Sequence, residues 1–183
     1  MRADHHGFAV TATTGFQRMR DKLTFRRLTT GEPPPWGLLL LADPSRPRVE
    51  AYLAGGHCYV AALAEPLPGA KYTEDAIIGV FVLVATEPRV YELMNVAVAE
   101  SHQGRGWGKQ LVHAAIAEAR RLGAESLEVG TGNSSLQQLA LYQKCGFRIV
   151  GVERDFFKKG YEADIYENGI RCLDMIRLSL SLT

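Results

Sequence analysis

A segment just past the middle of the chain, Gln103-Gly104-Arg105-Gly106-Trp107-Gly108, carries a glycine at every second position. It directly follows a strand pattern at Val90–Val98 and opens a helix pattern that runs from about 106 to 122. Glycines let backbone N–H groups turn toward one point, and the N-terminus of the following helix adds about half a positive charge. The segment therefore predicts a loop that binds phosphate oxygens. Arg105 and Lys109 would add side-chain cations, although ordinary surface charges would look the same.

Two common nucleotide-binding motifs do not fit this loop. The dinucleotide motif G-x-G-x-x-G requires a wider last spacing than Gly104, Gly106 and Gly108 provide, and the Walker motif requires Ser or Thr where Gln110 follows Lys109. The loop also follows several antiparallel strand patterns instead of opening a first βαβ unit. These observations disfavour NAD and ATP, and they leave coenzyme A, which also carries a pyrophosphate.

The remaining patterns predict an α/β (α+β) fold. Alternating or apolar runs favour strands at about 23–26, 57–63, 77–85, 90–98, 126–130, 147–152 and 171–180, and helical spacing favours helices at about 36–41, 47–53, 106–122 and 135–146. Ser135 and Gln138 predict a capping box at the start of the last helix. Antiparallel strands followed by βα units predict a mixed, mostly antiparallel sheet of about six or seven strands, flanked by about four helices.

Length and charge restrict the domain count and the partners. The 183 residues fit a single domain over 22–183, preceded by an extension over 1–21 that lacks a sustained period. A formal net charge of +1 gives no broad field for nucleic acid or anionic membranes. The N-terminus lacks the apolar run of a secretory signal or a membrane span. We therefore expect a cytoplasmic protein without nucleic-acid or membrane partners. Alternation at 173–182 would complete the sheet or pair with another chain, so both a monomer and a homodimer stay open.

The three cysteines, Cys58, Cys145 and Cys172, lie far apart and form no zinc-binding spacing. Widely separated, unpaired cysteines are typical of reduced thiols in a cytosolic protein. We accordingly expect no metal.

The glycine segment resembles the motif R/Q-x-x-G-x-G/A of the GNAT superfamily of N-acetyltransferases, which also follows a strand directly. Leu139-Ala140-Leu141-Tyr142-Gln143-Lys144-Cys145-Gly146-Phe147 is similar to the late L-Y-x-x-x-G-F signature of the same family. The resemblance extends from about 23 to the C-terminus. It implies the GNAT fold, acetyl-CoA as co-substrate and an amine as acceptor.

The family's cofactor contacts map onto this sequence by resemblance. In GNAT proteins the strand before the loop splays from its neighbour and pairs with the pantetheine, which implies this role for Val96, Ala97 and Val98. The residues implied in holding the pyrophosphate are Gln103, Gly104, Arg105, Gly106, Trp107, Gly108 and Lys109. Asn133 matches a position that often contacts the coenzyme, although a turn or cap residue would look the same.

Two glutamates are candidates for the general base that removes a proton from the amine. Alternation places Glu92 on the same strand face as Met94, Val96 and Val98, where burial would favour base function. A glutamate stands at this offset in the histone-acetylating branch of the family, but a strand-end glutamate that points to solvent is an equal alternative. Glu128 faces opposite to Leu127 and Val129 and matches the glutamate of the ribosomal-protein N-terminal acetylating branch.

Tyr142 is the candidate general acid, because the family's tyrosine at this position donates a proton to the departing sulfur. It lies off the apolar stripe of Leu136, Leu139 and Ala140, although an aromatic wedge between helix and loop is the alternative. An acetyl-cysteine intermediate at Cys145 is disfavoured, because nothing nearby in sequence would lower its pKa.

Two functions remain after this comparison. One is an acetyl-CoA-dependent N-acetyltransferase that acts on a small molecule or a peptide by direct attack in a ternary complex. The other is a non-catalytic sensor or interaction module that binds an acyl-CoA on the same fold. The presence of Glu92, Glu128 and Tyr142 favours the enzyme. The segments 65–75 and 153–170 are expected on the acceptor side, because the second gathers aromatic and acidic residues, namely Tyr161, Glu162, Asp164, Tyr166 and Glu167.

Overall fold

The computed structural model of the chain describes residues 22–63, 77–160 and 163–183. The extension predicted at 1–21 and the acceptor-side loop predicted at 65–75 lie outside the described residues. The proposed domain boundary near residue 22 therefore stays a prediction.

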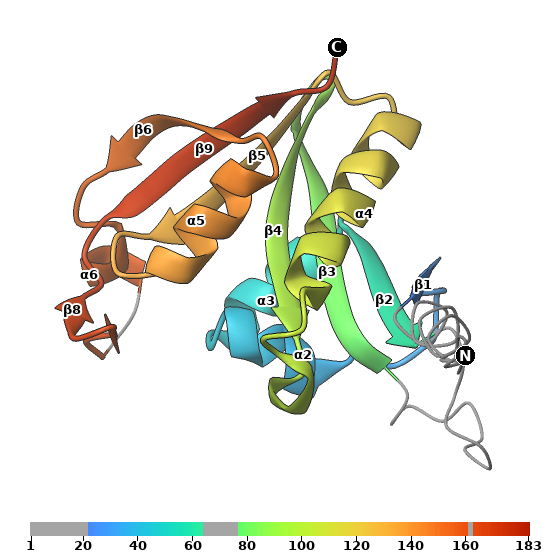
Figure 1. Cartoon of the computed structure of the whole chain (residues 1–183), viewed down its shortest axis with the longest axis horizontal. Helices are drawn as coiled ribbons and strands as arrows, with labels where there is room; N and C mark the ends of the chain where they lie inside the picture. The colour runs from blue at the N-terminus through green and yellow to red at the C-terminus, as the bar shows by residue number, and fades with distance from the viewer. Residues whose placement is uncertain (1–21, 64–76, 161–162) are drawn as a thin grey trace, which may run out of the picture.

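The main sheet has seven strands in the order β1-β2-β3-β4-β5-β9-β6 among the described residues (Figure 1). Its strands are β1 (Leu23–Arg27), β2 (His57–Leu63), β3 (Ile77–Glu87), β4 (Val90–Val98), β5 (Ser126–Gly132), β6 (Arg148–Glu153) and β9 (Met175–Ser181). Strands β4 and β5 run parallel, and every other neighbouring pair is antiparallel. The prediction of a mixed, mostly antiparallel sheet is confirmed. The C-terminal alternation completes this sheet, but β9 enters between β5 and β6 instead of adding an edge.

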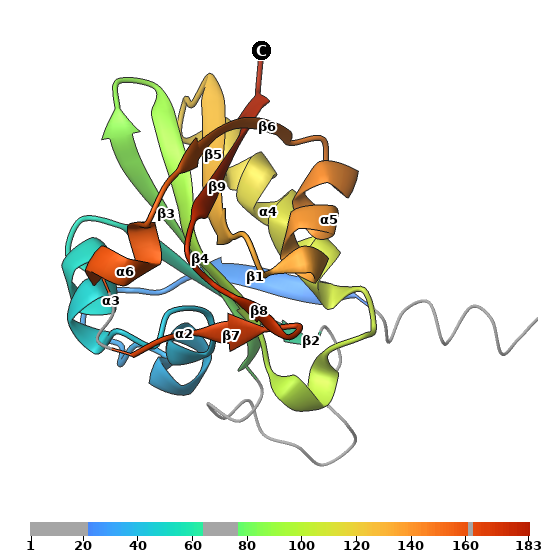
Figure 2. The ribbon, with the colours of Figure 1, turned by 90° about the vertical axis from the view of Figure 1, so that its left-hand side faces the viewer.

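Helices cover both faces of the sheet (Figure 2). On one face lie α4 (Trp107–Arg121) and α5 (Leu136–Lys144), and on the other lie α2 (Trp36–Ala42) and α3 (Arg46–Leu53). The short helix α6 (Phe156–Gly160) lies beside α3, where the Arg48 guanidinium sits 5.3 Å from the centre of the Phe156 ring. A 3-10 turn, η2 (Glu100–His102), and a small hairpin of β7 (Tyr166–Glu167) and β8 (Ile170–Arg171) complete the described elements.

Each face of the sheet has its own buried core. The apolar stripe of α4, including Leu111, Val112 and Ala115, packs on Phe81 and Leu127 of the sheet. This burial confirms the three- and four-residue spacing that predicted the helix. The opposite face packs α2 and α3 against β3 through a second cluster that includes Leu39, Val49, Val80 and Val82.

A buried amide fixes α2 and α3 against β4. Asn95 is 3% exposed, and its Nδ2 donates to the Leu39 carbonyl at 2.9 Å and to the Tyr52 hydroxyl at 2.8 Å. A buried amide is costly without partners, so these bonds select one position for the two helices. They set the distance between the helices and the half of β4 that leads into the glycine segment.

The predicted capping box at the start of α5 is wrong. Ser135 does occupy the N-cap position, but its side chain makes no capping bond. The Ser135 hydroxyl instead donates to the carboxylate of Glu167 in the β7–β8 hairpin. The Ser135 side chain thus bonds to a charged acceptor in a distant segment instead of capping the backbone N–H groups at the start of α5.

Candidate active site

The glycine segment forms an open loop between β4 and α4. Gly104 and Gly106 adopt φ of +74° and +83°, and nothing lies within 4 Å of the position where a Cβ would stand at either residue. Of the residues that the structure describes, none accepts a hydrogen bond from the N–H groups of Gly104, Arg105 or Gly106. The first N–H groups of α4 are also unpaired inside the helix. The loop therefore offers several unpaired N–H donors next to open positions at Gly104 and Gly106.

Three side chains of the loop have separate surroundings. Arg105 and Lys109 are exposed, so both cations are available to an anion at the loop. Trp107 is 5% exposed and belongs to the core, so this residue offers the loop its backbone N–H. The Gln103 side chain binds within the protein, because its Nε2 donates to the Val98 carbonyl at the end of β4 at 3.0 Å.

Strands β4 and β5 pair over a short distance and then diverge. Their parallel ladder has three residue pairs, Val90 with Ser126, Tyr91 with Leu127 and Glu92 with Glu128. Beyond this point β4 continues to Val98 with no strand on its β5 side in the described part of the chain. In Figure 1 the two strands meet near the C-terminus and separate toward the start of α4. The diverging half of β4 thus leaves backbone groups available for an additional extended chain.

The two candidate bases form the last pair before this divergence. We call Glu92 and Glu128 the apex pair, because the strands separate immediately beyond them. Partners in a ladder share a face, so both carboxylates lie on the face opposite α4. Leu127 and Val129 are buried on the α4 side, which confirms the predicted orientation of Glu128.

The two carboxylates have different partners. The Arg177 Nη1 donates to Glu92 Oε1 at 2.6 Å, and the side chains of Glu92 and Arg177 are 15% and 27% exposed. Arg177 also donates through Nε to Glu153 of β6. Burial lowers the pKa of the Arg177 guanidinium, but its bonds to Glu153 and Glu92 outweigh burial and raise that pKa above its ordinary value. For Glu128, by contrast, no donor or cation is found within the described ranges.

A glycine lets Arg177 reach Glu92. Arg177 belongs to β9 and Glu92 to β4, and β5 lies between these two strands. Arg177 stands opposite Gly130 of β5 in the ladder, and a Cβ at Gly130 would lie 3.1 Å from Arg177 Nη1 and 2.6 Å from Met175 Sδ. Without that Cβ, the guanidinium crosses β5 and bonds to a residue two strands away.

The alternation predicted along β4 is wrong beyond Met94. Leu93 pairs with Leu83 and Asn95 with Val82, so Met94 is an extra residue that forms a β-bulge. The bulge turns Val96 and Val98 toward the α4 core, whereas Ala97 packs on the α2 and α3 side. Glu92 therefore shares its face with Asn95 and Ala97 instead of Val96 and Val98. Pairing with β3 imposes this bulge, and the sequence of β4 alone does not reveal it.

Tyr142 is buried between α5 and the core. It is 5% exposed, and its ring meets Phe147 edge-on with 5.9 Å between the ring centres. The stripe predicted for α5 is wrong, because Leu136 is 48% exposed and Tyr142 is the buried residue of this helix. Burial, with a smaller effect of Cys145, raises the pKa of the Tyr142 phenol well above its ordinary value. The phenol consequently keeps its proton at neutral pH.

Cys145 lies near the same helix end. Burial raises the pKa of its thiol, although the charge of Lys109 acts in the opposite direction. A thiol with a raised pKa is a poor nucleophile at neutral pH.

Comparison with known proteins identifies the family. Residues 32–147 match the profile of the Acetyltransferase (GNAT) family. The chain belongs to the GNAT acetyltransferase family. It is 52% identical over 147 residues to YvbK, an uncharacterized N-acetyltransferase of Bacillus subtilis. The aligned residues cover 80% of this chain and 88% of that protein.

Two solved structures of acetyltransferases resemble this chain. A GNAT family acetyltransferase from Elizabethkingia anophelis with acetyl-CoA bound superposes with a TM-score of 0.79 at 43% identity, over 88% of this chain and 99% of the other. A Bacillus subtilis acetyltransferase in complex with CoA gives a TM-score of 0.78 at 48% identity, over 88% of this chain and 100% of the other. The predicted fold and family are confirmed.

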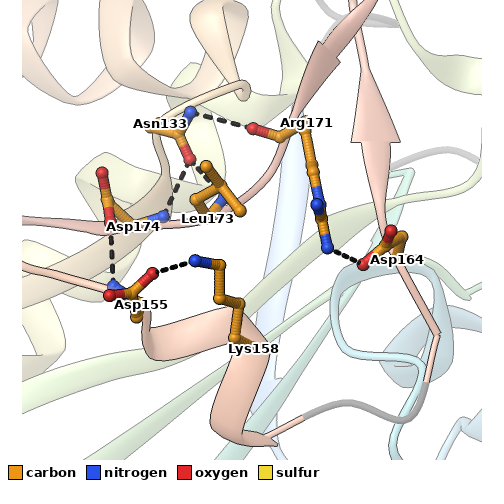
Figure 3. A network of polar contacts seen from close by, with 7 residues as sticks. All are labelled: Asn133, Asp155, Lys158, Asp164, Arg171, Leu173 and Asp174. Carbon is orange, nitrogen blue, oxygen red and sulfur yellow. Dashed lines mark hydrogen bonds and ion pairs between the residues drawn. The ribbon is translucent and has the colours of Figure 1, made fainter.

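Asn133 of this GNAT chain ties the end of β5 to the segment that leads into β9 (Figure 3). Its Oδ1 accepts from the N–H groups of Leu173 and Asp174 at 2.7 and 2.9 Å, and its Nδ2 donates to the Arg171 carbonyl at 3.1 Å. The amide therefore has the partners expected of a turn residue, which was one of the two predicted roles. Contact with a coenzyme stays a prediction.

Polar contacts extend from Asn133 toward the predicted acceptor side. Asn168 donates to the Ser134 carbonyl at 2.8 Å, and Arg171 pairs with Asp164. Asp174 accepts from the Asp155 N–H at 2.9 Å, while Lys158 pairs with Asp155 at 2.6 Å. Tyr166 and Glu167 form β7, and Tyr161 and Glu162 lie outside the described residues. These contacts hold the hairpin and α6 to the end of β5.

We predict that Asn133→Ala loosens this hairpin without abolishing coenzyme binding. The change leaves the Leu173 and Asp174 N–H groups without their acceptor, which should cost about 1–3 kcal/mol. Amide hydrogen exchange should accelerate over 163–174. Gln143→Ala serves as a control, because among the described residues the Gln143 side chain bonds only to Leu139 of its own helix. Unchanged exchange combined with weaker acetyl-CoA binding would contradict this prediction and favour the coenzyme contact.

Arg177 was not among the residues predicted for the site. Ile176, Leu178 and Leu180 alternate along β9 and pack on the α4 side, so Arg177 necessarily faces the opposite side. This alternation along β9 was the sequence signal that could have placed Arg177 on the same face as the two glutamates. Its partner Glu92 lies 85 residues earlier, and sequence spacing does not join two such positions.

Two further observations concern the described residues 22–63, 77–160 and 163–183. None of their helices combines the length and the apolar character needed to cross a membrane. They also contain no group of three or more His, Cys, Asp or Glu side chains arranged to hold a metal ion.

Proposed function

We propose that this GNAT protein transfers an acetyl group from acetyl-CoA to a primary amine of a small molecule or a peptide, by direct attack in a ternary complex. The observation that carries the proposal is the divergence of β4 and β5 between the glycine loop and the apex pair. This arrangement brings the glycine loop, an unpaired strand edge and two carboxylates to one region. Relatives of similar length that bind acetyl-CoA or CoA support the choice of co-substrate.

The loop and the strand edge divide the binding of acetyl-CoA between them. Gly104, Gly106 and the start of α4 would hold the pyrophosphate with backbone N–H groups, and Arg105 and Lys109 would add positive charge. The edge of β4 over Val96, Ala97 and Val98 would pair with the amides of the pantetheine like a short strand. In this arrangement the thioester points toward the apex pair.

We assign the general base to Glu128 and the general acid to Tyr142. The Glu128 carboxylate has no partner among the described residues, so it is available to accept a proton from the amine directly or through water. Glu92 is less suitable because Arg177 binds its Oε1. Tyr142 retains its proton at neutral pH and would donate it to the departing thiolate. The amine nitrogen thereby forms a bond to the acetyl carbon as the thioester bond breaks.

The alternative function is a sensor that binds acyl-CoA without turnover. It would need the loop and the strand edge but neither Glu128 nor Tyr142. Both side chains are in place, and the carboxylates around the apex outnumber the cations bonded to them, which favours a cationic amine as acceptor.

Thermal unfolding during a titration with acetyl-CoA tests the proposal. Ligand at about 100 times its dissociation constant should add roughly 2.7 kcal/mol, which raises Tm by several degrees for a domain of this size. ATP and NAD serve as controls, followed by an amine panel read by thiol release. Stabilisation by the nucleotides alone would contradict the loop assignment. Stabilisation by acetyl-CoA without thiol release from any amine would favour the sensor.

A further inference from the structure

The apex pair presents an electrostatic problem. Glu92 and Glu128 are direct partners across a parallel ladder, where neighbouring strands lie about 4.8 Å apart. Like charges directly opposite each other in a sheet are destabilising, and two adjacent carboxylates resist being ionised together. A general base must be ionised to accept a proton. A cation bonded to one member of the pair would offset this repulsion.

Arg177 is placed to do this. It reaches Glu92 across Gly130 with 2.6 Å between Nη1 and Oε1, and its second bond to Glu153 fixes the guanidinium from the β6 side. Arginine stays charged over the whole working range of pH, so the offset is permanent. The geometry leaves Glu128 as the unpaired member.

The other charged groups near this face bind elsewhere. Arg48 of α3 lies 3.5 Å from Asp43 at the end of α2 and over the Phe156 ring, and Lys158 of α6 pairs with Asp155 at 2.6 Å. Arg46 and Glu50 of α3 pair with each other at 2.9 Å on the exposed side of that helix. Within the described ranges, Arg177 is the cation that bonds to the apex pair.

We propose that Arg177 is a positioning residue for acetyl transfer, which neutralises Glu92 across Gly130 and thereby keeps the neighbouring Glu128 available as the base. This inference rests on the proposed function. It assigns Arg177 no contact with the substrate, because its action goes through the charge of Glu92.

A double-mutant cycle tests this assignment. Arg177→Met should lower kcat at least tenfold and move the acid limb of the pH–rate profile to higher pH, with little change in KM for acetyl-CoA. The double variant Glu92→Gln/Arg177→Met should recover most of the wild-type kcat and the wild-type pH–rate profile, because the charge that Arg177 offsets is then absent. The matched control is Arg148→Met on the exposed edge strand β6, which should behave like the wild type.

Two results would overturn the role of Arg177. One is an Arg177→Met variant as active as the wild type, and the other is a double variant as slow as Arg177→Met. Should Arg177→Met fail to fold, the double variant is compared with Glu92→Gln instead. Equal rates are expected there, and a slower double variant would show that Arg177 acts independently of Glu92.

The proposed function and this inference fail in different ways. A wild-type protein that releases no thiol from acetyl-CoA with any amine would overturn both. An active wild type without rescue in the double variant would overturn only the role of Arg177.

Discussion

Glu128→Gln is expected to lower kcat by about 10²–10⁴, the usual contribution of a general base. Glutamine keeps the size and the position of the side chain but cannot accept the proton of the amine. Binding of acetyl-CoA should not change, because the loop and the strand edge that hold it are untouched. Steady-state kinetics by thiol release, together with the acetyl-CoA thermal shift, measures both quantities.

Glu125→Gln is the matched control, because Glu125 pairs with Arg89 on the surface just before β5. This variant should have the kcat of the wild type. Glu92→Gln should lower kcat less than Glu128→Gln does. A larger loss in Glu92→Gln would reverse the assignment of the base. If kcat fell by less than about tenfold in both variants, catalysis by a carboxylate base would have to be abandoned.

Gly106→Ala is expected to weaken acetyl-CoA binding at least tenfold, or by about 1.4 kcal/mol. The new Cβ would stand in the open space at the start of α4, where the pyrophosphate is expected to approach the backbone. Gly106 also has φ of +83°, so alanine there strains the backbone by about 1–2 kcal/mol. Isothermal titration with acetyl-CoA measures the affinity, and thermal unfolding without ligand measures the strain.

The chain contains a matched control for this strain. Gly123, beyond the other end of α4, has the same φ of +83° and equally open surroundings. Gly123→Ala should lower Tm as much as Gly106→Ala does, while leaving the affinity for acetyl-CoA unchanged. Equal affinities in the two variants would indicate that the glycine loop does not contact the coenzyme.

Local signals predicted the elements of this fold well. The glycine spacing and the helical pattern of α4 depend on residues a few positions apart, and α4 begins and ends within a residue or two of the prediction. Alternation also located β9, because Ile176, Leu178 and Leu180 pack on one face of the sheet and show the period of a strand directly. The same local alternation predicted the orientation of Glu128, opposite to the buried Leu127 and Val129.

Three of the failures depend on partners outside the element concerned. The bulge at Met94 arises from pairing with β3, and the capping box at Ser135 is lost to Glu167 in a later hairpin. Arg177 finds Glu92 only after β9 has entered the sheet beside β5. Each of these contacts is decided by tertiary geometry, which residue spacing within one element does not report.

The position of β9 restricts the order in which this molecule can form during synthesis. Strands β5 and β6 do not touch in the finished sheet, because β9 lies between them. Domains begin to fold as they leave the ribosome, N-terminal parts first. The sheet from β1 to β4 can therefore assemble early, whereas β6 waits without a partner until Met175–Ser181 emerge. A stop codon before Met175 would leave Glu92 without its arginine and β6 without the strand that it pairs with in the sheet. Truncated chains of this protein should therefore be prone to aggregate.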